Sequence, residues 1–366
     1  MILQFVFTGD NIMNKPIFPI NLYYKNNPGH IETLDLCRGN DDFRKVYIIS
    51  EEQKKIVIKH CSNAFTDSEK INGWFRLAES YNKIGIYCPS CIPTLSGKSI
   101  YRYTENNRDY YVYAEEYAPF KTVPQIGRKN LNDATGQPIY LADLMRSVGK
   151  VASAHFDLLS WPSQFCLLEE HPYGSTDETT LAATKFSEII KNTCPEFRKR
   201  MENILALFLN LQTVIKTIYD QLPTSCFQGD LNDSNILLNK DFQFVGVIDF
   251  NVCGREPVLN YAIREALMHI ENSVLFDEDG NELYFYNDEL EKIRMRSFKK
   301  NIEYISEFYH FNAYEKYAFP LLYRYISSFW WEQVHALKQF SYDKTKVEKI
   351  LNWIELQLTR QDIYLL

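Results

Sequence analysis

The most informative part of the chain is QGDLNDSNILL at residues 228–238, followed by FVGVIDF at residues 244–250. Asp230 and Asn235 lie five positions apart, and Asp249 follows Asn235 by fourteen positions. Each of the three carries a side-chain oxygen, and two of them carry a carboxylate. No other segment of the sequence combines residue type and spacing in so specific a way.

The two apolar runs of this stretch are separated by the turn-forming sequence NKD, and together they predict a β-hairpin. A hairpin brings the start of its first strand beside the end of its second. We therefore expect Asn235 and Asp249 to lie side by side. Asp230 lies just upstream, after Gly229, where the backbone can turn sharply.

Two carboxylates and a carboxamide that converge beside an apolar hairpin suit a hard cation such as Mg²⁺ and the phosphates that it carries. In such a site Asp230 would orient an attacking hydroxyl and accept its proton, while Asn235 and Asp249 would hold the metal ion. Each of these residues alone is also an ordinary turn or cap residue. The complete set, with its spacing and its hairpin, favours phosphoryl transfer.

The pattern Asp230-x₄-Asn235, together with Ile248-Asp249-Phe250, resembles the catalytic loop and metal-binding strand of kinase-fold enzymes. Gly229 before the aspartate is similar to the aminoglycoside phosphotransferase and choline kinase group of small-molecule kinases. Typical protein kinases have Arg before the catalytic Asp and Gly after the metal-binding Asp-Phe, whereas Asn251 stands at the second position here.

This resemblance implies an α+β, two-lobed protein-kinase-like fold. Residues 1–118 would form a small antiparallel β-sheet N-lobe with one main helix and a linker. Residues 119–366 would form a larger, mostly helical C-lobe with the catalytic loop and the acceptor site. Apolar residues at helical spacing in residues 142–159 and 201–222 agree with a helical C-lobe.

Three short apolar runs near the N-terminus predict strands joined by two tight turns. They cover residues 34–38, 45–49 and 55–59. The resemblance implies that the first turn, which contains Gly39, covers the nucleotide phosphates. It also implies that Lys59, on the third strand, binds the α- and β-phosphates. Lys54 and Lys55 are alternatives, although both flank the second turn and are expected to face solvent.

A helix is expected after residue 66, and the resemblance implies that it carries a glutamate that pairs with Lys59. Glu69 and Glu79 are the two candidates, and Glu69 is the one assigned to the nucleotide site. A surface carboxylate on a helix is an equally good interpretation of either residue.

Residues 109–118 predict a strand that runs into the linker. The resemblance implies that backbone groups of Glu116, Tyr117 and Ala118 contact the adenine of ATP. Such contacts leave little signature in side chains, and an edge strand without a nucleotide role is the alternative.

Two positions depart from the pattern of the group. Gln228 stands where relatives commonly have a scaffold His, and Asn260 stands near an Asp that anchors the following helix in many relatives. Neither departure removes Asp230, Asn235 or Asp249, so we expect an active enzyme. A glutamine still donates and accepts hydrogen bonds.

Composition limits the classes of function. The chain has 366 residues and is 45% hydrophobic, which is ample for a core. Its net charge of −7 argues against nucleic-acid binding through a general basic field. Eight widely spread cysteines do not resemble a secreted disulfide scaffold. Without a signal-peptide pattern or a membrane-length apolar run, we expect a cytoplasmic protein.

The sequence therefore predicts a transferase that uses ATP and Mg²⁺ to move the γ-phosphate to a hydroxyl of a small-molecule acceptor. The alternative is a kinase-like regulatory protein that binds a nucleotide or metabolite without turnover. The acceptor remains open: Glu256, Glu265 and acidic residues 277–279 suit a cationic group, but surface charge or packing explains them better. ATP or GTP preference and oligomeric state also remain open.

Overall fold

The computed structural model describes residues 17–39, 41–51, 54–132, 138–168, 177–269 and 288–364. The chain divides into two compact units. The first consists of Met1–Phe75 and Pro89–Pro119, and the second of Arg76–Cys88 and Phe120–Leu366. The sequence placed all of residues 1–118 in one lobe, whereas the structure groups residues 76–88 with the helical unit.

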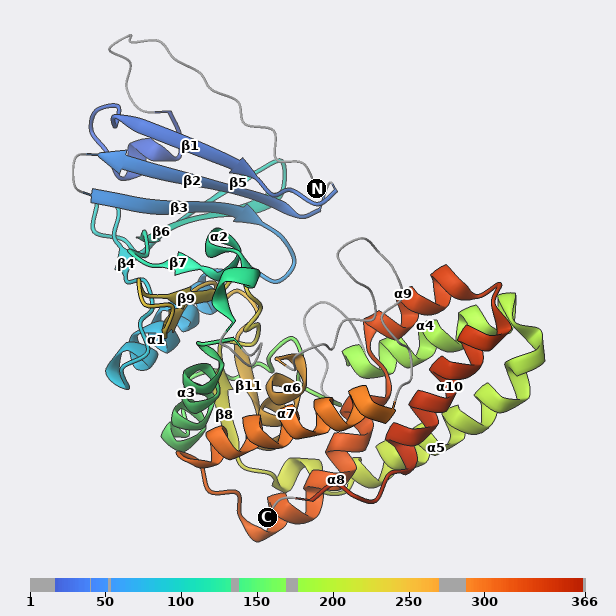
Figure 1. The fold of residues 1–366 in the computed structure, drawn as a ribbon. Coiled ribbons are helices and arrows are strands. Elements are labelled where there is room, and N and C mark those ends of the chain that lie inside the picture. The colour runs from blue at the N-terminus through green and yellow to red at the C-terminus, as the bar shows by residue number, and fades with distance from the viewer. Residues whose placement is uncertain are drawn as a thin grey trace. The chain divides into compact units, whose positions relative to one another are not determined.

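The first unit is built on an antiparallel sheet with the strand order β1-β2-β3-β6-β4, in which β5 also pairs with β6 (Figure 1). The strands are β1 (His30–Asp35), β2 (Phe43–Glu51), β3 (Lys54–Ser62), β4 (Cys91–Ile92), β5 (Ile100–Glu105) and β6 (Arg108–Glu116). The predicted strands at residues 45–49 and 55–59 lie inside β2 and β3. The strand predicted at residues 34–38 lies nearer the N-terminus in the structure, where β1 begins at His30 and ends at Asp35.

One face of this sheet is packed by side chains at every second position, as expected for strands. Ile49, Ile58 and Val112 are fully buried there, and Ile20 from the 3-10 helix η1 (Ile20–Leu22) covers them. The β-branched residues of these strands thus form the core on this side of the first unit.

Helix α1 (Ser68–Lys83) begins in the first unit and ends in the second. Its residue Trp74 packs edge-on against Tyr113 of β6, with ring centroids 6.0 Å apart. In the second unit, the hydroxyl of Tyr81 accepts a hydrogen bond from the Gln228 amide at 3.0 Å. Contacts of this kind explain why residues 76–88 belong to the helical unit.

The predicted hairpin is confirmed: β9 (Ile236–Leu238) pairs antiparallel with β10 (Phe244–Val247), and β7 (Lys121–Thr122) adds a third strand. Gly246 of β10 bridges to Tyr87. A Cβ at Gly246 would lie 2.0 Å from the Tyr87 carbonyl oxygen, so the close approach requires glycine. A separate two-stranded sheet joins β8 (Thr224–Phe227) to β11 (Gly254–Pro257).

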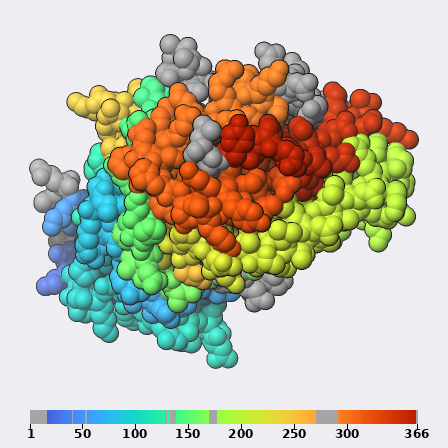
Figure 2. Space-filling view, turned by 90° about the horizontal axis from the view of Figure 1, so that it is seen from below, coloured from blue at the N-terminus to red at the C-terminus, as the bar shows by residue number. Residues whose placement is uncertain are grey.

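Helices form most of the second unit. They are α2 (Val123–Ile126), α3 (Leu141–Ala154), α4 (Glu178–Thr193), α5 (Arg198–Lys216), α6 (Val258–Met268), α7 (Asp288–Ser306), α8 (Ala313–Ser328), α9 (Trp331–Phe340) and α10 (Lys344–Thr359). Short 3-10 helices are η2 (Arg128–Leu131), η3 (Pro195–Phe197) and η4 (Tyr219–Gln221). Helices α5, α8 and α10 pack on one another, and Figure 2 shows them along the face seen from below.

The two predicted C-lobe helices exist, but both end earlier than their apolar periodicity suggested. Helix α3 stops at Ala154 because His155 adopts a left-handed conformation with φ +46°. Helix α5 ends at Lys216, and the chain continues into η4. No helix in the described part of the chain is both long enough and apolar enough to span a membrane.

An aromatic cluster lies at the end of the core of the first unit, around His60 of β3. Phe18, Phe43, Tyr103 and Tyr110 surround the imidazole ring. Its Nε2 lies 3.0 Å from the Tyr103 hydroxyl, whereas its buried Nδ1 has no partner among the described residues. Burial, and to a lesser degree Lys45, lowers the pKa of His60 to about 4.

We expect acid to destabilise the first unit through His60. Above pH 6.5 the imidazole is neutral in both the folded and unfolded states. As the pH falls from 6.5 towards 4, only the unfolded chain takes up the proton, so stability is lost. Between pH 7.5 and pH 5, the free energy of unfolding should fall by about 2 kcal/mol more in the natural protein than in His60→Gln. Unfolding in urea, monitored by hydrogen exchange of the β3 amides, measures this free energy in both proteins. An equal fall in stability in the two proteins would contradict the role assigned to His60.

Candidate functional site

The loop at residues 228–235 leaves strand β8 through a tight turn at Gly229. This residue has φ +92°, a conformation that favours glycine. A Cβ there would lie 2.6 Å from the Val252 carbonyl oxygen, so the residue is also restricted by space. The turn directs the following residue, Asp230, away from β8.

Asp230 and Asn235 are in direct contact. The Asn235 Nδ2 donates to the Asp230 carbonyl oxygen at 2.9 Å and to Asp230 Oδ2 at 3.2 Å. Asn232 Nδ2 also donates to Asp230 Oδ2, at 2.7 Å. Asn235 is buried, and the carboxylate of Asp230 is therefore held on one side by two amides.

The hairpin brings Asp249 to the same place. The backbone N–H of Ile248 donates to the Asn235 carbonyl oxygen at 3.0 Å, so the residue before Asp249 is tied to Asn235. Asp249 has φ +62°, an uncommon conformation for a residue other than glycine. This conformation ends the strand and turns the chain at the carboxylate. The three predicted residues thus lie together in the second unit.

Gln228 joins the two aspartate segments. Its Nε2 donates to the carbonyl oxygens of Ile248 at 3.0 Å and Asp249 at 2.7 Å, and its Oε1 accepts from the Asp230 N–H at 2.7 Å. The side chain is fully buried. In the sequence, Gln228 stood out as a departure from the usual His that can still donate and accept hydrogen bonds. The structure shows that it uses this capacity to link the segments of Asp230 and Asp249.

The electrostatic setting makes Asp230 a better proton acceptor. Burial raises the pKa of its carboxyl group, the hydrogen bond from Asn232 opposes that rise, and Glu265 and Asp249 add to it. Arg264 lowers the same pKa. The net direction is upward, which is the direction that strengthens a general base.

The chemistry of the donor set fits Mg²⁺. Asp249 supplies carboxylate oxygens and Asn235 a carboxamide oxygen, which are the hard ligands that this ion prefers. The Asn235 amide nitrogen is already committed to Asp230. Asn251 Nδ2 lies 3.4 Å from Asp249 Oδ2. A cation here would also reduce the repulsion between the Asp230 and Asp249 carboxylates.

In the first unit, Lys59 pairs with Glu115, a carboxylate that the sequence had not suggested as its partner. Lys59 Nζ lies 2.8 Å from Glu115 Oε1, and both side chains are mostly buried. The register pairs Lys59 with Tyr113, so Glu115 is its diagonal neighbour on the same face of the sheet. Glu69 is exposed on α1. The strand thus supplies one carboxylate partner for Lys59, and the assignment of Glu69 to the nucleotide site stays a prediction.

The remaining predicted nucleotide contacts lie at two places in the first unit. Gly39, with φ +68°, lies in the exposed turn between β1 and β2. The N–H groups of Glu116 and Tyr117 donate to the carbonyl oxygens of Ser90 at 2.9 Å and Lys55 at 3.1 Å. The Ala118 N–H has no backbone partner among the described residues, so it suits an adenine contact better than the other two.

The acidic candidates for an acceptor contact are not exposed. Glu256 and Glu265 are both fully buried. Glu256 accepts from Ser163 Oγ at 2.8 Å, and Glu265 pairs with Arg264 at 2.7 Å. These partners explain the two glutamates as internal charges, and residues 277–279 lie outside the described residues.

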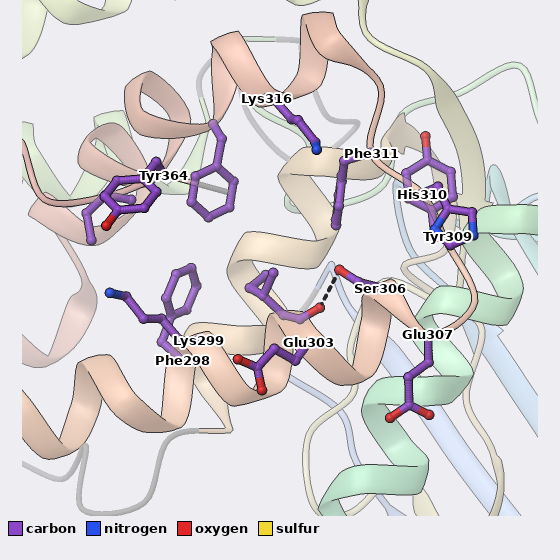
Figure 3. A pocket seen from close by; sticks show the side chains of 13 residues that line it. Phe298, Lys299, Glu303, Ser306, Glu307, Tyr309, His310, Phe311, Lys316 and Tyr364 are labelled. Carbon is purple, nitrogen blue, oxygen red and sulfur yellow. Dashed lines mark hydrogen bonds between the residues drawn. The ribbon is translucent and has the colours of Figure 1, made fainter. Parts of the chain in front are cut away.

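The second unit also contains a cavity of about 480 Å³ between α7, α8 and the C-terminal segment (Figure 3). Its floor is apolar, and its rim carries charges. Figure 3 shows the Lys316 side chain above the Phe311 ring, whereas Glu307 points away. Glu307 is bonded to Arg146 at 2.7 Å. No residue of the segment 228–250 lines this cavity, so it is distinct from the site at Asp230.

No protein-family model and no curated protein matches the chain. Among solved structures, an aminoglycoside phosphotransferase from Alicyclobacillus acidocaldarius is similar, at 13% identity and a TM-score of 0.51 over 94% of this chain and 93% of that chain. A microcompartment-associated aminopropanol kinase has 11% identity and a TM-score of 0.49 over 93% of each chain. A choline kinase from Cryptosporidium parvum has 12% identity and a TM-score of 0.38 over 90% of this chain and 88% of that chain.

The last two scores are too low to support an argument, and 13% identity establishes the fold alone. The architecture agrees with the first likeness, since an antiparallel sheet precedes a mostly helical region. The resemblance that the sequence motif indicated is thus confirmed for the fold: this chain has the kinase-like fold of the aminoglycoside phosphotransferases.

Proposed function

We propose that the protein is a small-molecule kinase that transfers the γ-phosphate of ATP to an acceptor hydroxyl. The observation that carries the proposal is the contact between Asp230 and Asn235, with Asp249 tied beside them by the Ile248–Asn235 hydrogen bond. A base, a carboxamide and a second carboxylate at one place match the requirements of phosphoryl transfer.

Each residue has a distinct role in the proposed reaction. Asp230 orients the acceptor hydroxyl and accepts its proton, with the raised pKa of its carboxyl group in support. Asn235 and Asp249 hold Mg²⁺, which neutralises charge on the phosphates when it is bound. Lys59 binds the α- and β-phosphates, and Glu115 orients it.

The acceptor class is best found by direct assay. The similar structure with a TM-score above 0.5 is named an aminoglycoside phosphotransferase, and the sequence motif resembles that group together with the choline kinases. We therefore propose a panel of amino sugars, amino alcohols, amino acids and nucleosides with Mg-ATP and, separately, Mg-GTP. ADP or GDP release that depends on one acceptor supports the kinase. Tight nucleotide binding without turnover across the panel supports the regulatory alternative.

Replacement of Asp230 should separate chemistry from binding. In Asp230→Asn the side chain keeps its size but cannot accept the proton, so kcat should fall by about 10²- to 10⁴-fold. Affinity for Mg-ATP should change little. The matched control is Asp241→Asn, an exposed residue in the β9–β10 turn. Full turnover in Asp230→Asn would show that another group acts as the base.

Replacement of Asp249 should affect the metal. Asp249→Asn removes the negative charge of the proposed ligand, so the Mg²⁺ concentration that gives half-maximal nucleotide binding should rise by about tenfold or more. Titration calorimetry with ATP over a range of Mg²⁺ concentrations measures this. Asp241→Asn is again the control. An unchanged Mg²⁺ requirement would remove Asp249 from the metal site.

The partner of Lys59 can be tested by a pair of glutamate substitutions. Glu115→Gln should raise the KM for ATP by about tenfold, because Lys59 loses the charged hydrogen bond that orients it. Glu69→Gln should leave the KM within about twofold, since Glu69 is exposed. Steady-state kinetics at saturating acceptor distinguishes the two. The opposite ranking would favour the helix-borne pair.

A further inference from the structure

Arg264 of helix α6 reaches the turn that carries Asp230. Its side chain is almost completely buried, and its Nη2 donates to the Gly229 carbonyl oxygen at 3.2 Å. The same nitrogen lies 2.7 Å from Glu265 Oε1. The peptide that joins Gly229 to Asp230 is therefore held by a charged donor from a different element.

The guanidinium group lies against two aromatic rings. Its central carbon lies 4.3 Å from the centroid of the Phe165 ring and 5.2 Å from that of Tyr261. Tyr261 in turn stacks on Phe227 of β8, with centroids 3.9 Å apart. These contacts leave the Arg264 head group little freedom, so its hydrogen bond restricts the turn.

Packing alone does not explain a charged residue at this position. Nε and Nη1 of Arg264 are buried and have no hydrogen-bond partner among the described residues. Each such donor carries a desolvation penalty. Apolar residues of similar volume often replace a buried ion pair without loss of stability. The hydrogen bond from Nη2 to the Gly229 carbonyl oxygen gives this buried charge a role that packing does not.

Neighbouring polar residues of α6 do not provide the same contact. Asn260 Nδ2 donates to Glu256 Oε2 at 2.5 Å and to the Phe165 carbonyl oxygen at 3.3 Å. Both acceptors lie outside the segment 228–235. Among the α6 side chains in the described part of the chain, Arg264 is the one that hydrogen-bonds to this segment.

We propose that Arg264 is a positioning residue for the transfer reaction: by holding the Gly229 carbonyl, it fixes the peptide that presents the Asp230 carboxylate to the acceptor hydroxyl. This inference rests on the proposed kinase function. In this role Arg264 acts through the Gly229 peptide and touches neither substrate nor nucleotide. Its effect should therefore fall on kcat, with nucleotide binding preserved.

The test uses the double variant Arg264→Met/Glu265→Gln, which removes both partners of the ion pair, so that neither is left as a buried charge without the other. We expect kcat to fall by about 10- to 100-fold while the KM for ATP stays within about twofold. Hydrogen exchange at residues 229–232 should become at least about tenfold faster, with exchange in α10 unchanged. Arg264→Lys, which keeps the positive charge and can still donate hydrogen bonds, should recover part of both losses.

The matched control is Arg200→Met/Glu355→Gln, which removes another Arg–Glu pair, 2.6 Å apart, between α5 and α10. It should leave kcat and exchange at residues 229–232 unchanged. If the Arg264 double variant matches the natural protein in both measurements, the inference is overturned. If the natural protein shows no turnover with any acceptor, the proposed function fails and the role of Arg264 in transfer fails with it, whereas hydrogen exchange still shows whether Arg264 restrains the turn at Gly229.

Discussion

The buried carboxamide of Gln228 is the group on which the geometry of the site depends. Its two ends bind groups that are about twenty residues apart: the Asp230 N–H on one side and the Ile248 and Asp249 carbonyls on the other. Because the side chain is fully buried, water cannot compete for these bonds. A glutamine serves here because one side chain supplies both a donor and an acceptor.

A second constraint is the balance of buried charge around Asp230. Asp249 and Glu265 raise the pKa of the Asp230 carboxyl group, and Arg264 acts in the opposite direction. In Arg264 itself, burial lowers the pKa, but Glu265 and Glu256 outweigh it, so the group stays charged. The result is a partly buried carboxylate that borders both a cation and other anions. Such a setting suits a base that must bind a proton only transiently.

In the first unit, strand register brings a lysine and a carboxylate together. The adjacent strands β3 and β6 place Lys59 and Glu115 on one face, with the Nζ-to-carboxylate distance at 2.8 Å. The corresponding part of α1 carries Trp74, which packs against Tyr113. Lysine orientation is therefore built into the strand register, which is set by many backbone hydrogen bonds and is hard to shift.

The sequence by itself determined the local features of this protein: the β9–β10 hairpin, the approximate strands of the first sheet, the presence of the C-lobe helices, and the meeting of Asp230, Asn235 and Asp249. These follow from turn chemistry, apolar periodicity and short separations along the chain. The ends of the helices were not predicted correctly. Helix α3, for example, ends before His155 because this residue is left-handed, and the apolar pattern carries no sign of that conformation.

Only the tertiary structure decided which distant groups meet. Glu115 lies 56 positions beyond Lys59, and Arg264 lies 35 beyond Gly229, so neither contact could be inferred without the strand register or the helix position. The same holds for residues 76–88, which join the second unit through Tyr81 and Tyr87. The physical reason is that such contacts depend on how whole elements pack, and a local pattern fixes the shape of an element but not its neighbours.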